Sequence, residues 1–222
     1  MDSDHTVSQL RGRLGDDVAT ALRRSADLGF LGRMPVDEQI DHALGFVMAV
    51  EVALGRHPSS AADLGTGGGL PGLVLHSAWP RCRLVLMDGN QRRTEFLSST
   101  VGGWSGAGTV EVVRGRVEEL ARDDQYRERF EAVTARSFGS PGVTVECGAP
   151  LVVVGGVMVV SEPPEESAEH RWSVEGLAQV GLTLGARARF DDRFGYQVLV
   201  KSAATPVRYP RRVGIPAKRP LF

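Results

Sequence analysis

The residues best suited to chemistry form a glycine-rich turn between Asp63 and Gly72. The segment reads Asp-Leu-Gly-Thr-Gly-Gly-Gly-Leu-Pro-Gly and holds five of the chain's 27 glycines. Glycine allows a positive φ angle and a close approach of a ligand to the backbone, so Gly65, Gly67 and Gly69 are the expected contact points. The acid before the turn, Asp63, suits a cationic or amine-bearing ligand better than a pyrophosphate, which would need a bare helix N-terminus.

A second acid ends the next predicted strand. Asp88 follows an apolar run that begins at Arg83, and it lies 23 residues after Gly65. Its carboxylate can accept hydrogen bonds from both hydroxyls of a ribose. A glycine-rich first turn with an acid about 20 residues later is typical of nucleoside-cofactor sites in Rossmann-type sheets. The residues alone fit S-adenosylmethionine (SAM), NAD or, as a third alternative, a glycine turn with only a structural role.

The elements that would position these residues alternate along the chain. Strands are predicted at 61–64, 83–88, 109–114, 130–135, 151–160, 182–190 and 195–201, and helices at 70–78, 90–101, 116–127, 138–148 and 168–180. This alternation predicts an α/β fold with a mostly parallel, seven-stranded, Rossmann-like sheet covered on both faces. The last two strands are separated only by a short turn at 191–195, which predicts an antiparallel C-terminal hairpin. Such a hairpin resembles the class I methyltransferase fold, whereas an NAD-binding domain would usually continue with another parallel unit.

The composition excludes several classes of protein. With 222 residues, 42 % of them hydrophobic and 24 % charged, the chain resembles an ordinary globular domain. A net charge of −1 is not that of a strongly basic nucleic-acid binder, so any RNA site must be a local patch. Two cysteines without a C-x-x-C pair and five scattered histidines predict neither a disulfide framework nor a metal site. Because the N-terminus is acidic and no apolar run approaches 18 residues, we expect a cytoplasmic protein without a membrane span.

The chain is expected to divide into three parts. Apolar residues at helical spacing predict helices over 6–29 and 36–54, and these would form an N-terminal helical cap at 1–58. The sheet and its helices would make a core at 59–203. A basic, proline-rich tail would follow at 204–222.

The predicted tail has an unusual composition. From Arg208 onward it contains five basic residues, three prolines and no acid. The prolines exclude a regular helix or central strand, so an extended segment is expected. It would either lie on an RNA backbone, through Arg211 and Arg212, or dock on the protein's own acidic surface. We favour RNA of these two alternatives.

Four further arginines near the predicted cleft are candidate ligand contacts. Arg136 ends the fourth strand, at the edge where open α/β sheets bind ligands, and its guanidinium suits RNA phosphates. Arg92 and Arg93 stand at a helix N-terminus, where the helix dipole disfavours positive charge, and this argues for an external partner. Arg116 follows the third strand beside the expected adenine edge, where Val117 can read the base. For each arginine the alternative is an exposed side chain without a ligand.

These motifs occur together in one known family. The chain resembles the bacterial small-subunit rRNA guanine-N7 methyltransferases, the RsmG or GidB family, in five segments: Asp63 to Gly72, Asp88 with Arg92-Arg93, Arg116-Val-Glu-Glu119, Ala135-Arg-Ser-Phe138 and the tail from Tyr209 to Leu221. The resemblance covers about residues 61 to 222. It implies a SAM-dependent enzyme that methylates N7 of a guanine in 16S rRNA, with the small ribosomal subunit or its RNA as partner. Because N7 carries a free lone pair, no general base is needed and alignment would supply most of the catalysis.

The resemblance also implies a role for each matching position. The cofactor would be bound by Asp63, Gly65, Thr66, Gly67, Gly69, Leu70, Asp88, Gly89, Arg116, Val117, Glu118 and Arg136. The RNA side would comprise Arg92, Arg93, Arg136, Arg211 and Arg212, and Arg136 would be the catalytic residue. No metal is implied.

Three segments on the expected substrate side depart from the family. A Trp-Asp-Arg-His-like segment is replaced by Val36-Asp-Glu-Gln-Ile-Asp-His42, a Lys-Gly pair after the fifth strand by Ser161-Glu162, and an Arg-His pair near the last strand by Gly195-Tyr196. These departures keep two alternatives open beside rRNA methylation. One is a methyltransferase acting on a small molecule or another RNA, and the other is a SAM-binding protein without transferase activity. The oligomeric state is left open.

Overall fold

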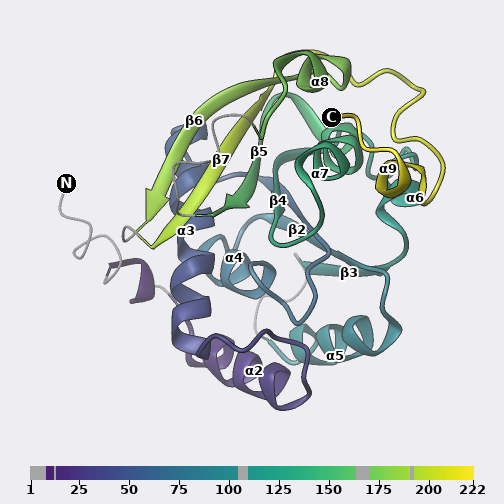
Figure 1. Cartoon of the computed structure of the whole chain (residues 1–222). Helices are drawn as coiled ribbons and strands as arrows, with labels where there is room; N and C mark the ends of the chain where they lie inside the picture. Colours follow the sequence, from purple (N-terminus) through teal and green to yellow (C-terminus); the bar gives the residue numbers. More distant parts are fainter. Residues whose placement is uncertain (1–8, 13, 105–109, 164–170, 191–192) are drawn as a thin grey trace.

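A seven-stranded sheet forms the middle of the molecule (Figure 1). The computed structural model describes residues 9–12, 14–104, 110–163, 171–190 and 193–222. The strands are β1 (Ser60–Leu64), β2 (Arg83–Asp88), β3 (Val110–Arg114), β4 (Phe130–Ala135), β5 (Val152–Glu162), β6 (Leu182–Phe190) and β7 (Phe194–Lys201). Their order in the sheet is β3-β2-β1-β4-β5-β7-β6. Strands β1 to β5 run parallel, and β7 lies antiparallel between β5 and β6. The predicted parallel sheet with an antiparallel hairpin is confirmed.

The strands carry two apolar cores, one on each face of the sheet. Successive side chains of a strand point to opposite faces, and the two cores follow this alternation. Ala61, Leu84 and Leu86 belong to one core, while their neighbours Ala62 and Val85 belong to the other. The central strands are buried on both faces, as expected for a parallel sheet covered by helices.

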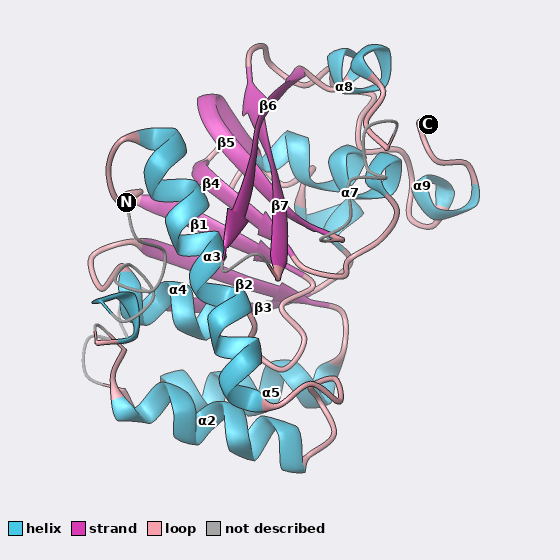
Figure 2. Ribbon diagram, turned by 60° about the vertical axis from the view of Figure 1, so that its left-hand side comes forward, coloured by secondary structure: helices cyan, strands magenta, loops and turns pink. Residues whose placement is uncertain are grey.

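The helices form a layer on each side of the sheet (Figure 2). One layer contains α3 (Val36–Leu54), α4 (Gly72–Ala78) and α5 (Gln91–Val101), with α2 (Asp16–Asp27) packed against α3 and α4. The other contains α6 (Val117–Leu120), α7 (Pro141–Gly148), the 3-10 turn η2 (Ala149–Leu151) and α8 (Val174–Gln179), and α9 (Ile215–Lys218) packs on α7. Within the described ranges no helix has the length and apolar character needed to cross a membrane.

Three predicted helices are shorter in the structure. The helix predicted at 116–127 ends at Leu120, because the backbone then turns and Asp123 Oδ1 accepts the N–H of Gln125 at 2.8 Å. The helix predicted at 138–148 begins only at Pro141, a residue favoured at the first helical position. The helix predicted at 168–180 is α8, which begins after Ser173, whose hydroxyl accepts the N–H of Gly176.

The N-terminal prediction is confirmed in part. Helix α3 has the predicted bounds, whereas the helix predicted at 6–29 is continuous only from Asp16 to Asp27. Parts of the predicted elements at 6–29, 109–114 and 168–180 and of the turn at 191–195 lie outside the described residues. The division of the chain into cap, core and tail stays a prediction.

Candidate active site

The glycine turn between β1 and α4 has an unusual backbone conformation. Gly65, Gly67 and Gly69 have φ angles of 60°, 58° and 104°, a region that residues with a Cβ rarely adopt. A Cβ at Gly65 would also lie 2.8 Å from a ring carbon of Phe138. Position 65 therefore needs glycine both for its backbone angle and for the ring that packs on it.

Asp88, at the end of β2, is hydrogen-bonded to this turn. Its Oδ2 accepts the N–H of Gly67 at 2.9 Å, and its Oδ1 accepts the N–H of Asn90 at 2.7 Å. The side chain is 8 % exposed. Since each carboxylate oxygen has two lone pairs, Asp88 can still accept hydrogen bonds from ribose hydroxyls.

A cavity of about 200 Å³ lies beside Asp88 at the carboxyl ends of the first strands. Six of the predicted cofactor residues line it: Gly65, Asp88, Gly89, Arg116, Val117 and Glu118. Five further lining residues had no predicted role in cofactor binding: Gly115, Phe138, Val143, Cys147 and Ala217. Open α/β sheets bind their ligands at this edge, and the cavity places the Asp88 carboxylate near the apolar side chains of Val117, Phe138 and Val143.

The remaining predicted cofactor residues do not line this cavity. Thr66, Gly67, Gly69 and Leu70 belong to the glycine turn but are not among the lining residues. Asp63 is fully buried, and its carboxylate accepts the N–H of Gly72 at 3.0 Å and the hydroxyl of Thr134 at 2.8 Å. Burial raises the pKa of Asp63 to about 6, although these hydrogen bonds favour the ionised carboxylate and so lower the pKa. Asp63 thus ties the glycine turn to the start of α4 and to β4.

Arg136 extends from the end of β4 toward helix α3. Its Nη2 donates to Oε1 of Gln39 at 2.8 Å. Burial lowers the pKa of the guanidinium, while the nearby Asp63 carboxylate raises it. The next residue, Ser137, has a φ of 52°, a conformation that is uncommon for residues other than glycine. Arg136 therefore connects α3 to a constrained segment at the edge of the sheet.

Arg92 and Arg93 lie at the start of α5, near the cofactor side of this edge. The guanidinium of Arg92 lies 5.8 Å from the ring centre of Phe30. Arg93 Nη1 lies 3.8 Å from Oδ2 of Asp88. The predicted RNA contacts of both arginines stay predictions, since each side chain also has a partner within the protein.

The C-terminal segment docks on the protein, and Arg211, which was expected to contact RNA, pairs with a buried acid. The Arg211 guanidinium donates to both carboxylate oxygens of Glu146, at 2.8 and 2.6 Å, and the backbone N–H of Arg211 donates to the same carboxylate at 2.8 Å. Glu146 is completely buried. The N–H of Gly214 donates to Oε1 of Glu118 at 3.1 Å. Contrary to the extended segment expected, Ile215–Lys218 forms the short helix α9, and Ala217 reaches the cavity.

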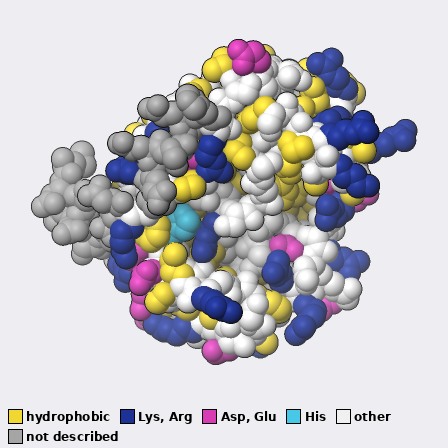
Figure 3. Space-filling model, in the orientation of Figure 1, with side chains coloured by type: hydrophobic (Ala, Val, Ile, Leu, Met, Phe, Trp, Pro, Cys, Tyr) yellow, Lys and Arg dark blue, Asp and Glu magenta, His cyan; other side chains and the backbone are white. Residues whose placement is uncertain are grey.

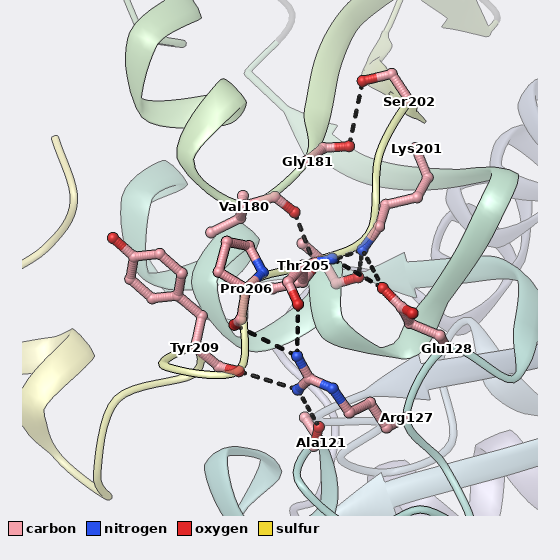
Figure 4. A network of polar contacts seen from close by, with 11 residues as sticks. Ala121, Arg127, Glu128, Val180, Gly181, Lys201, Ser202, Thr205, Pro206 and Tyr209 are labelled. Atoms are coloured by element: carbon pink, nitrogen blue, oxygen red, sulfur yellow. Dashed lines mark hydrogen bonds and ion pairs between the residues drawn. The ribbon is translucent and has the colours of Figure 1, made fainter.

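A half-buried arginine and a buried lysine anchor the start of this segment (Figure 4). The Arg127 guanidinium donates to the carbonyl oxygens of Ala121, Thr205 and Tyr209 at 3.2, 2.8 and 3.0 Å. The Lys201 ammonium donates to the hydroxyl of Thr205 and lies 3.5 Å from Glu128. Burial lowers the pKa of Lys201 to about 8. The segment after β7 is thus fixed to the body of the protein by side chains that lie just before β4 and at the end of β7.

The docked segment leaves other basic residues on the surface. Arg208, Arg212, Lys218 and Arg219 are exposed. Figure 3 shows Lys and Arg side chains gathered on the side of the molecule where the C-terminal segment lies. Of the two tail arginines assigned to RNA, only Arg212 is exposed, since Arg211 is half-buried in its ion pair.

A second cavity, of about 300 Å³, opens at the ends of β4 and β5. Its lining residues are His42, Ser137, Gly139, Pro141, Val160, Ser161, Glu162, Pro163, Arg171 and Trp172. Sequence reasoning assigned none of these residues to a site, because the histidines had no metal spacing and Ser161-Glu162 was noted only as a departure from a family pattern. The departures at Val36–His42 and at Ser161-Glu162 were the available signals.

A third and larger cavity lies away from this edge. It measures about 680 Å³ and is lined by residues 57–59 and 77–82, which precede β1 and β2. It therefore opens at the amino ends of these strands. Ligands of open α/β sheets bind at the carboxyl ends, so the two smaller cavities are the better candidates for an active site.

The comparisons with known proteins agree with this geometry. A family model described as rRNA small subunit methyltransferase G matches residues 36–178. The chain belongs to this family. Ribosomal RNA small subunit methyltransferase G of Leuconostoc citreum is 34 % identical over 173 residues, which are 76 % of this chain and 72 % of the relative. The relative from Rubrobacter xylanophilus is 32 % identical over 197 residues, which are 85 % of this chain and 75 % of the relative.

Membership of the rRNA small subunit methyltransferase G family confirms the predicted enzyme class, a SAM-dependent methyltransferase. The fold comparison agrees. An O-methyltransferase from Bacillus cereus, solved in complex with SAH, superposes with a TM-score of 0.60 at 14 % identity, covering 85 % of this chain and 91 % of the other. The O-methyltransferase TomG from Streptomyces achromogenes gives a TM-score of 0.57 at 18 % identity, covering 85 % of this chain and 91 % of the other. The predicted class I methyltransferase fold is confirmed.

Proposed function

We propose that this protein transfers the methyl group of SAM to N7 of a guanine in small-subunit ribosomal RNA. The observation that carries the proposal is the cavity shared by the glycine turn, Asp88 and Val117 in a chain of the rRNA small subunit methyltransferase G family. The finer assignments to 16S rRNA and to N7 rest on the family resemblance in the sequence.

The residues of the first cavity fit a nucleoside cofactor. The Asp88 carboxylate can accept from ribose hydroxyls, and the buried Val117 offers an apolar contact for adenine. A Cβ at Gly89 would meet no protein atom nearer than 3.7 Å, so a ligand has room there. When bound, SAM supplies an electrophilic methyl group on a positively charged sulfur.

The contribution of the protein to the reaction is mainly alignment. The N7 lone pair of guanine needs no deprotonation, so a general base is not required. The protein must hold N7 about 3 Å from the methyl carbon and in line with the sulfur. Such alignment accounts for much of the rate gain in methyl transfer. The segment 137–139 lines both cavities, with Phe138 in the first and Ser137 and Gly139 in the second. The Arg136–Gln39 hydrogen bond is well placed to fix this segment.

The exposed basic residues of the C-terminal segment support RNA as the partner. Arg208, Arg212, Lys218 and Arg219 lie close in sequence on a chain whose net charge is −1, so the positive charge is local. Lys and Arg neutralise backbone phosphates and make RNA affinity dependent on salt. An RNA acceptor therefore predicts methyl transfer that weakens steeply as ionic strength rises, whereas transfer to a small molecule would not.

The test uses labelled SAM. The protein is incubated with small ribosomal subunits, or their RNA, from a strain that lacks the N7 modification, and the RNA is digested and analysed for 7-methylguanosine. Label in 7-methylguanosine supports the proposal. If SAM binds but no label enters any RNA fraction, the proposal is wrong, and the remaining alternatives are a small-molecule acceptor or SAM binding without transfer.

A further inference from the structure

The second cavity contains three buried polar atoms without a hydrogen bond. They are Oε1 of Glu162, Nε1 of Trp172 and Nε2 of His42. Among the described residues, six buried side-chain nitrogen or oxygen atoms lack such a bond, so half of them line this one cavity. Buried polar atoms are rarely left without partners, since desolvation is then uncompensated. This concentration indicates a ligand with its own donors and acceptors.

Glu162 is the principal recognition group in the cavity. Its side chain is 1 % exposed. Oε2 accepts from Nη1 of Arg171 at 2.9 Å, while Oε1 has no partner. Burial raises the pKa of this carboxyl, and the Arg171 charge opposes that rise. The carboxylate thus offers free acceptor positions to a ligand that brings N–H donors.

Two further groups in the cavity complement this carboxylate. The indole N–H of Trp172 lies near enough to this carboxylate to help lower its pKa, but it makes no hydrogen bond of ordinary geometry. His42 stacks on Phe194 with ring centres 4.7 Å apart, and burial lowers its pKa to about 4, so the ring is neutral at physiological pH. Beside the carboxylate and its Arg171 partner, the cavity therefore presents an indole donor and an uncharged imidazole, and Ser137 and Ser161 also line it.

We propose that this cavity binds the Watson–Crick edge of the acceptor guanine, with Glu162 accepting from N1–H and from the N2 amino group and Trp172 donating to O6. This inference rests on the function proposed above and names the groups that select the base. N7 lies on a different edge of the purine, so it stays free to face the cofactor cavity across residues 137–139.

Guanine fits this arrangement better than the other bases of RNA. It is the base whose Watson–Crick edge carries two adjacent N–H donor groups beside a carbonyl acceptor. A carboxylate can accept from both donors at once. Adenine, cytosine and uracil each bring a ring or carbonyl acceptor to a position where Glu162 offers only acceptors, which would leave buried groups unpaired. A volume of about 300 Å³ is at the small end of the range for ligand pockets, as a single base requires.

The experiment compares guanosine with inosine, which lacks only the N2 amino group. Small subunits are reconstituted with RNA that carries either nucleoside at the acceptor position mapped by the assay above, and kcat/KM for methyl transfer is measured. The wild-type protein should methylate the inosine subunit about ten- to a hundredfold less efficiently. In Glu162→Ala the two subunits should be methylated with equal, low efficiency. Glu162→Gln should also lower kcat/KM for guanosine, because its amide NH₂ opposes the N–H donors.

The controls separate recognition from folding and from the proposed function. Glu175→Gln changes an exposed acid of α8 outside the cavity, and it should behave like wild type. Unchanged SAM affinity in the Glu162 variants shows that the fold is intact. If Glu162→Ala does not fold, Glu162→Gln replaces it in the comparison of guanosine with inosine. Equal methylation of guanosine and inosine by wild type would overturn the guanine-edge assignment and leave the proposed function standing. Absence of transfer to guanosine by wild type would overturn both.

Discussion

The backbone N–H of Gly67 donates to Oδ2 of Asp88 at 2.9 Å. Gly67 belongs to the turn after β1, and Asp88 is the last residue of β2, the strand beside it. The hydrogen bond joins the two halves of the nucleoside-site pattern into one structural unit. The acid that is suited to bind the ribose also supports the turn on which the ligand would lie.

The first prediction concerns Asp88. Asp88→Asn should raise the SAM dissociation constant by about tenfold or more, because a hydrogen bond to a charged group is worth about 1.5–3 kcal/mol. Isothermal titration calorimetry measures the change. Glu119→Gln, an exposed acid outside the cavity, is the matched control. Equal SAM affinity in wild type and Asp88→Asn would remove Asp88 from the cofactor site.

The second prediction concerns Gly65. Gly65→Ala should abolish measurable SAM binding, since the positive φ costs about 1–2 kcal/mol and the added Cβ would lie 2.8 Å from the Phe138 ring. Gly55→Ala is the matched control: Gly55 has a φ of 68°, but a Cβ there would meet no atom within 4 Å. Gly55→Ala should lower the free energy of unfolding and leave SAM affinity unchanged. A similar loss of SAM affinity in both variants would contradict the role of Phe138.

The third prediction concerns Arg136. Arg136→Ala should lower kcat for methyl transfer about tenfold or more, since small misplacements near reacting atoms have large effects on rate, with SAM affinity nearly unchanged. Arg136→Lys retains the positive charge near Asp63 and keeps the fold testable. Steady-state kinetics and calorimetry on both variants separate the two effects. Loss of SAM affinity equal to the loss of transfer would place Arg136 in the cofactor site instead.

The fourth prediction compares the neighbours Arg211 and Arg212. Arg211→Ala should lower the free energy of unfolding by about 3–5 kcal/mol, because it leaves the buried Glu146 carboxylate without its cation. Arg212→Ala changes an exposed side chain and should alter stability by less than about 0.5 kcal/mol. Urea denaturation measures both. If the two variants unfold at the same urea concentration, the docked position of the C-terminal segment is wrong.

Arg212 should instead affect RNA binding. Loss of one phosphate contact in Arg212→Ala predicts weaker binding to all RNA sequences. In a plot of log binding constant against log salt concentration, the slope should decrease in magnitude by about one. Filter binding of Arg212→Ala between low and moderate salt measures this slope. A slope equal to that of wild type would exclude Arg212 from the RNA interface.

The fifth prediction concerns acid stability. Hydrogen bonds from Arg56 at 2.9 and 2.8 Å and from the N–H of Ser59 at 2.7 Å lower the pKa of Glu131 to about 2, against an ordinary value of 4.5. A carboxyl with a lowered folded pKa stabilises the fold above its unfolded pKa, and this contribution is lost as pH falls through the folded value. Stability should therefore decrease between about pH 4.5 and pH 2, and Glu131→Gln should decrease less over the same window. Parallel pH profiles for the two proteins would contradict the prediction.

The sheet and the cofactor side of the site could be predicted because their signals are local in the sequence. Asp63 to Gly72 and Asp88 each mark the end of a strand, and parallel strands bring these ends to one edge. Apolar alternation and strand length then determine most of the order of elements. No longer-range information was needed to place Gly65, Asp88 and Val117 around one cavity.

The C-terminal segment and the second cavity depend on pairs that no local pattern reveals. Glu146 and Arg211 are 65 residues apart, and a basic, proline-rich composition is compatible with either docking or RNA binding. Glu162, Trp172 and His42 come from β5, the segment before α8, and α3. Their convergence requires the packing of α3 across the sheet, which residue spacing does not specify. Arg136 points toward Gln39 for the same reason.

The first cavity has walls from residues far apart in the sequence, Gly65 and Ala217. A polypeptide made from its N-terminus onward therefore completes the glycine turn and β2 long before the last wall of the pocket exists. Until residue 217 has left the ribosomal exit tunnel and α9 has docked, the nascent domain lacks part of the wall of this cavity. The walls of this cavity are consequently complete only after all the strands of the sheet have been made.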